Sequence, residues 1–126
     1  MLEKPKNYIN LYQPEINEYG NDHNYDKIFI WKTEKGNITL TITISLQETT
    51  ELGQFYLVTA DINTYDIKGQ GRFIWNYLTN QLELLAKEKR KKVLHQAKPN
   101  EYSEYLMAND HRYKKRKNGL YYALYQ

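Results

Sequence analysis

The chain has 126 residues and a formal net charge of +3, and it contains no cysteine. Its length fits a single domain spanning residues 1–126, and 40% hydrophobic and 26% charged residues are typical of a globular protein. The lack of cysteine excludes disulfide scaffolds, iron–sulfur clusters and thiol nucleophiles. With no long apolar run and no apolar N-terminal signal region, the sequence predicts a cytoplasmic protein without membrane contact.

The charge is unevenly distributed along the chain. Residues 87–117 hold 11 of the 18 basic residues but only 4 of the 15 acidic ones. Two clusters, Lys87–Lys92 and Arg112–Lys117, account for most of this excess. They are either a solvated surface or a site for an anionic partner, for instance nucleic acid with neighbouring tyrosines as stacking platforms.

Residues 1–25 have no clear pattern and fit either a short helix or a strand with loops. Lys27–Lys32 predicts a first strand. From 38 to 46 the apolar residues alternate strictly with threonine and serine. This period of two predicts an antiparallel strand with one face on the core. A third strand is expected at Phe55–Ile62.

The second half of the chain changes period. Apolar residues from Phe73 to Leu85 follow the spacing of an amphipathic helix that ends near Arg90. We expect a short strand at 93–97, a helix at 101–108 and a closing strand at 120–125. The order β-β-β-α-β-α-β predicts an α+β fold: a mixed, mainly antiparallel sheet with helices packed on it.

The segment DIKGQGRF at 66–73 joins the third strand to the long helix. Glycines allow a sharp turn and close approach of a ligand, and a helix N-terminus offers N–H groups to an anion. The segment lacks the Gly-Lys-Ser/Thr of a Walker loop and the third glycine of a dinucleotide fingerprint. It is either a structural turn or a phosphate site formed by Lys68, Gly69, Gln70, Gly71 and Arg72.

The chain from Asp61 onward has its segments in this order: a strand, the KGQG loop, a helix ending in LLAKEKRKK, the strand VLHQAKP and the helix NEYSEYLMAND. This order of segments resembles the Gcn5-related N-acetyltransferase (GNAT) superfamily. The resemblance covers about residues 55–126. It implies that the Gly69–Gly71 loop holds the pyrophosphate of acetyl-CoA, a co-substrate, and that an amine acceptor is acylated. It also implies that Tyr105 protonates the departing thiolate, and that the basic clusters could steer CoA.

Two segments depart from the family pattern. Asp66 stands where the family usually has Arg or Gln, and Asn109–His111 replaces an expected Gly-Phe. These departures favour a second interpretation, a non-enzymatic nucleic-acid- or protein-binding module of a phage or mobile element that retains the fold.

The remaining polar residues give weaker indications. Asp61 and Glu48 are candidates for a general base at the acceptor amine, but carboxylates at strand ends are also common surface residues. The three histidines have no metal-ligand spacing, so we expect no metal site. Trp31 and Trp75 are expected in the core or an interface.

Overall fold

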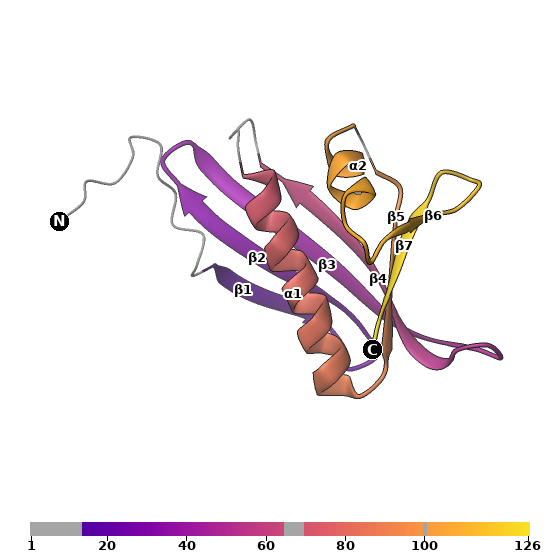
Figure 1. Ribbon diagram of the computed structural model, residues 1–126. Coiled ribbons are helices and arrows are strands. Elements are labelled where there is room, and N and C mark those ends of the chain that lie inside the picture. The colour runs from indigo at the N-terminus through magenta and orange to yellow at the C-terminus, as the bar shows by residue number, and fades with distance from the viewer. Residues whose placement is uncertain (1–13, 65–69, 100) are drawn as a thin grey trace.

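The computed structural model describes residues 14–64, 70–99 and 101–126, and within them it contains one seven-stranded sheet and two helices (Figure 1). The elements are β1 (Glu15–Gly20), β2 (Asn24–Thr33), β3 (Gly36–Thr49), β4 (Gly53–Asn63), α1 (Gly71–Lys89), β5 (Lys92–Ala97), α2 (Glu101–Ala108), β6 (Lys114–Lys115) and β7 (Tyr121–Tyr125). The strand order in the sheet is β1-β2-β3-β4-β5-β7-β6. Every pairing is antiparallel except β4 with β5.

The α+β class with a mixed, mostly antiparallel sheet is therefore confirmed. The predicted order of seven elements is incomplete, because β1 precedes it and β6 interrupts its end. Five of the six residues of β1 are exposed, so this edge strand has no alternating pattern to detect. The two residues of β6 lie within a run of basic side chains.

The core lies between one face of the sheet and α1. Ile38, Leu40, Ile42 and Ile44 on β3 are at most 3% exposed, and the threonines between them face the other way. Against them α1 packs buried side chains that include Ile74, Trp75, Leu78 and Leu82. Met107 of α2 belongs to the same cluster, so both helices pack on this face.

The C-terminal end of α1 is basic. Its last turn carries Lys87 and Lys89, which complement the helix dipole, and Arg90 ends it in the left-handed conformation with φ of 54°. Among the helices that the structure describes, none is both long and apolar enough to cross a membrane.

Candidate functional site

The only parallel ladder among the described strands joins β4, which precedes α1 in the chain, to β5, which follows it. It joins Phe55–Val58 of β4 to Lys92–His95 of β5 and ends there, although β4 continues to Asn63 and β5 to Ala97. Figure 1 shows the two strands diverging toward these carboxyl ends. Beyond Val58, β4 still pairs with β3 on its other side, but its β5-facing edge has no strand to pair with in the described residues. A ligand placed here could hydrogen-bond to that edge.

The N-terminus of α1 adjoins this place. Ile74 donates the first intrahelical hydrogen bond, to the Gln70 carbonyl at 3.0 Å, so the N–H groups of Gly71 and Arg72 have no carbonyl within the helix. Gln70 occupies the N-cap position without a side-chain cap, and the first turn contains no acidic residue. Such an end favours an anion.

Glycine at position 71 is not required by the fold. A Cβ there would meet only the Leu106 Cδ1 atom, at 3.9 Å, which is an ordinary van der Waals contact. Gly71 and Arg72 are exposed, whereas Lys68 and Gly69 of the predicted phosphate loop, with Asp66, lie outside the described residues. The described part of the loop is thus open to a ligand at Gly71.

The two candidate catalytic residues come from different faces of the sheet. Tyr105 on α2 is 63% exposed, and α2 packs on the α1 face. Asp61 on β4 pairs with Thr41 and is exposed. Its neighbours Ala60 and Ile62 pack against the core cluster, so by alternation Asp61 faces away from α1. No hydrogen bond joins the two side chains in the described part of the chain.

The structure separates the two basic clusters. Lys87–Lys92 surrounds the end of α1 and the start of β5. Arg112–Lys117 lies at β6, which pairs with the opposite end of β7 from the one that lies beside Val93. The basic residues therefore do not form one continuous patch.

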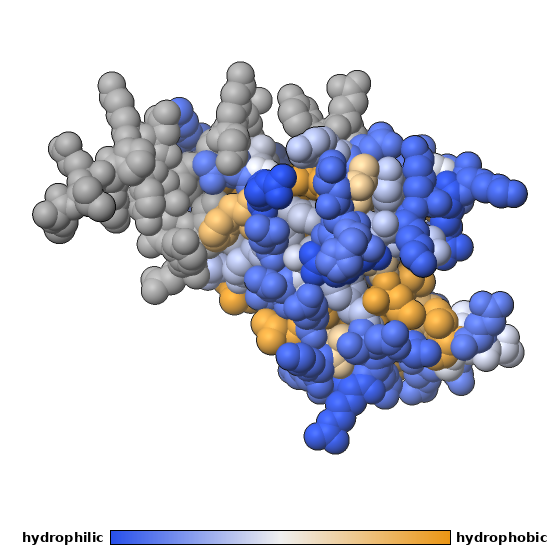
Figure 2. Space-filling model, in the orientation of Figure 1, coloured by the Kyte–Doolittle hydropathy of each residue, from blue (hydrophilic) through white to orange (hydrophobic). Residues whose placement is uncertain are grey.

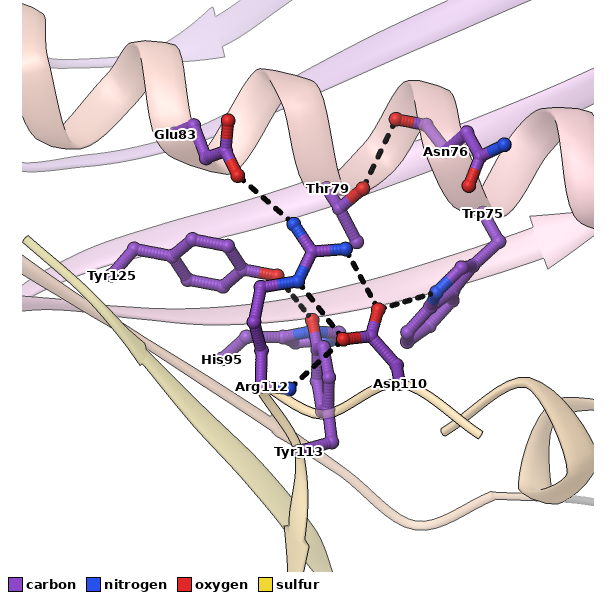
Figure 3. A network of polar contacts seen from close by, with 9 residues as sticks. All are labelled: Trp75, Asn76, Thr79, Glu83, His95, Asp110, Arg112, Tyr113 and Tyr125. Atoms are coloured by element: carbon purple, nitrogen blue, oxygen red, sulfur yellow. Dashed lines mark hydrogen bonds and ion pairs between the residues drawn. The ribbon is translucent and has the colours of Figure 1, made fainter. Parts of the chain in front are cut away.

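Arg112 is held within the molecule rather than presented to a partner (Figure 3). Its guanidinium donates two hydrogen bonds to Asp110, from Nε to Oδ1 at 2.9 Å and from Nη2 to Oδ2 at 2.7 Å. Nη1 donates to Glu83 of α1 at 2.9 Å. Asp110 also accepts from the Trp75 indole N–H at 3.0 Å. This arrangement ties the segment after α2 to the middle of α1.

The charge of Asp110 is stabilised by these donors. Burial alone would raise the pKa of this carboxyl, but hydrogen bonds from Arg112 and Trp75, with the positive charge of Arg112, lower it to about 2. The pKa of Arg112 is raised, mainly by its hydrogen bond to Asp110. The pair is ionised at neutral pH and acts as a structural clamp.

A second polar chain lies beneath this clamp. His95 Nδ1 lies 2.6 Å from the Tyr113 hydroxyl, which lies 2.7 Å from the Tyr125 hydroxyl. His95 is 1% exposed, its Nε2 has no hydrogen-bond partner among the described residues, and burial lowers its pKa to about 4. Burial, followed by the effect of Tyr125, raises the pKa of Tyr113. The imidazole is therefore neutral at pH 7 and packed in the core.

Sequence reasoning missed this network. In the sequence Asp110 stands out only as part of the departure from the family motif at 109–111, and Arg112 only as part of a basic cluster. The signal that could have indicated the clamp is the spacing Asp-x-Arg-Tyr directly after a helix, because an Asp at a turn can accept from the backbone two residues on. Arg112 N–H does donate to Asp110 Oδ1, at 3.0 Å.

Within the described residues no group of three or more His, Asp or Glu side chains is arranged to hold a metal ion. Comparison of the chain with protein-family models, with curated proteins and with solved structures gave no match.

Proposed function

We propose that this protein is an acyl-CoA-dependent N-acetyltransferase with a GNAT-like arrangement of strands. The observation that supports it is the junction of β4, the N-terminus of α1 and the diverging ends of β4 and β5. An uncapped helix N-terminus next to a strand edge that has no paired strand in the described residues suits a ligand that carries a phosphate at one end and amides along its length. CoA has both features.

In the proposed reaction the acceptor amine attacks the thioester carbonyl carbon, and the carbon–sulfur bond breaks. A backbone N–H of β4 polarises the carbonyl oxygen. Asp61, directly or through water, takes the proton from the amine, and Tyr105 gives its proton to the departing thiolate. Because these two residues come from opposite faces of the sheet, the thioester has to lie between the diverging strand ends for both to reach it.

Thermal unfolding in the presence of acetyl-CoA tests the proposal. At 100 times its Kd, acetyl-CoA should stabilise the fold by about 2.7 kcal/mol. For a domain of this size that corresponds to a rise in Tm of about 8–13 °C. No shift at millimolar acetyl-CoA would contradict the proposal.

A pair of variants locates the effect. Gly71→Leu fills the phosphate approach, and its Cβ makes only an ordinary contact with Leu106, so the free protein should keep its Tm and lose the acetyl-CoA shift. Asn80→Leu puts the same side chain at an exposed position further along α1 and should keep the shift. Equal shifts in both variants would place the ligand elsewhere.

A specific observation favours a second candidate, nucleic-acid binding at the β6–β7 hairpin. There Lys114, Arg116 and Lys117 are exposed, and the Arg116 guanidinium lies 4.4 Å from the centre of the Tyr122 ring. Cations beside an aromatic face suit a phosphate backbone and a stacked base.

The salt dependence of binding tests this candidate. In a log–log plot of the binding constant for single-stranded nucleic acid against salt concentration, the slope should be about −0.7 per phosphate contact. Changing the three residues to Gln should remove up to three of these contacts. A slope unchanged by the triple substitution would exclude this hairpin.

A further inference from the structure

A groove of about 340 Å³ lies at the opposite end of α1 from Gly71. It separates the β1–β2 hairpin from the last turns of the helix. Its floor is apolar and comes from the buried side chains of Ile42, Ile44, Leu82 and Leu85. In Figure 2, hydrophobic residues interrupt the otherwise hydrophilic surface along the β1 side of α1. The volume is at the lower end of the range for small-molecule sites.

The walls of the groove carry three carboxylates and two ammonium groups. Glu18 of β1 forms a loose ion pair with Lys27, 3.6 Å between Oε1 and Nζ. Asp22 in the hairpin turn and Glu88 on α1 have no ion-pair or hydrogen-bond partner in the described part of the chain. The groove therefore has an excess of negative charge, with two carboxylates available.

The Tyr25 side chain also lines the groove. Burial raises the pKa of its hydroxyl to about 12, and the negative charges of Glu18, Tyr56 and Glu88 add to the rise, so two carboxylates of the groove act on this side chain. The Lys89 ammonium lies 5.9 Å from the centre of the ring. A primary ammonium of the chain itself thus already lies over the Tyr25 ring, so the ring can accommodate a group of this kind.

We propose that this groove binds a protonated primary amine on an aliphatic stem. The stem would pack on the floor formed by β3 and α1. The ammonium would displace Lys89 from the Tyr25 ring and lie between Asp22 and Glu88. The source is either a free linear diamine or a lysine side chain, since both present the same chemistry.

This site is distinct from the acetyl-transfer site. Glu88 follows Gly71 by 17 residues, about 25 Å of helix at 1.5 Å per residue. An amine bound in the groove is therefore too far from the N-terminus of α1 to be acylated there. The proposal stands or falls independently of the proposed enzyme activity.

Titrations followed by amide chemical shifts on the full chain test the groove. The probes are 1,5-diaminopentane and the Nα-acetyl methylamide of lysine, and 1,5-pentanediol is the neutral control of equal length. We expect one or both amines to shift the amides of residues 18–27 and 81–89, and the diol to leave them unchanged. Binding by the lysine derivative indicates recognition of a protein side chain, and binding by the diamine alone indicates a small metabolite. Shifts from neither amine at 10 mM, or equal shifts from the diol, would overturn the proposal.

Two substitutions with opposite expected signs sharpen the test. Glu88→Gln removes an exposed carboxylate and should weaken amine binding by about threefold to fivefold. Lys89→Met removes the competing ammonium and should tighten binding by about twofold to fivefold. Glu51→Gln, in the exposed turn between β3 and β4, is the matched control and should bind as the parent does. If Glu88→Gln and Glu51→Gln bind equally, or Lys89→Met binds more weakly, the assignment is wrong.

Discussion

Acid should destabilise this protein through His95, and the size of the effect follows from its burial. The pKa of this imidazole falls from its ordinary 6.5 to about 4 because burial disfavours the charged form. The unfolded chain therefore takes up a proton near pH 6.5, whereas the folded chain does so only near pH 4. The contribution of the neutral imidazole to the free energy of unfolding is therefore complete above pH 6.5, and it is lost as the pH falls toward 4. Over about 2.5 pH units, at about 1.36 kcal/mol per unit, this amounts to about 3 kcal/mol.

The assay is urea unfolding at half-unit steps from pH 7.5 to pH 4.5, with the free energy of unfolding plotted against pH. His95→Asn removes the titrating group and keeps an amide near the position of Nδ1. Its curve should be flatter than that of the parent by up to about 1.36 kcal/mol per pH unit below pH 6. The comparison uses slopes because the smaller side chain leaves a cavity that lowers stability at every pH.

Tyr113→Phe is the control for the hydrogen bonds. It leaves His95 Nδ1 and the Tyr125 hydroxyl without their partner and should cost about 1–3 kcal/mol. Since burial, not the hydrogen bond, lowers the pKa of His95, the pH slope should stay that of the parent. Parallel curves for His95→Asn and the parent would refute the reasoning, as would a slope lost in Tyr113→Phe.

Three further outcomes are expected. Gly20→Ala should destabilise the β1–β2 hairpin by about 1–3 kcal/mol in urea unfolding, because φ is +125° there and a Cβ would collide with the Asn24 carbonyl oxygen. Arg112→Lys keeps the charge but loses the bidentate hydrogen bond to Asp110, so it should lower the free energy of unfolding by about 1–2 kcal/mol at pH 7. That cost should shrink as the pH falls from 4 to 2, since the parent then loses the ionised carboxylate too. Tyr105→Phe should lower acetyl-transfer turnover by about 10²–10⁴-fold and Tyr102→Phe should leave it unchanged, whereas equal rates in both would exclude Tyr105 as the acid.

Regular periodicity made most elements predictable from the sequence. The alternation from 38 to 46 identified β3, and the helical spacing from Phe73 to Leu85 identified α1, which ends at Lys89 as expected near Arg90. The helix expected at 101–108 is α2, with the same bounds. Each of these elements buries one face, so its apolar residues recur at the spacing of a strand or a helix and can be recognised in the sequence.

The parts of the structure that could not be predicted have no regular spacing of apolar residues. β1 is held by its ladder to β2 and by the turn that Gly20 allows, and neither depends on apolar side chains at alternate positions. The Asp110–Arg112 clamp consists of residue types that usually face solvent, and only the packing of the segment after α2 against Trp75 brings them inside. The Trp75–Asp110 contact joins residues 35 apart in the chain and leaves no local signal, unlike the spacing of Asp110 and Arg112.

The position of β7 between β5 and β6 has a consequence for how the molecule folds. Strands β1 to β4 pair with their neighbours in sequence through short turns, so their contacts close small loops and can form early. By contrast the β5–β7 ladder closes a longer loop, since Leu94 pairs with Leu124 across 30 residues of chain. We expect pulse-labelled hydrogen exchange during refolding to protect the amides of β2 and β3 first. The β5–β7 ladder, and with it the His95–Tyr113–Tyr125 contacts, should close in a later phase.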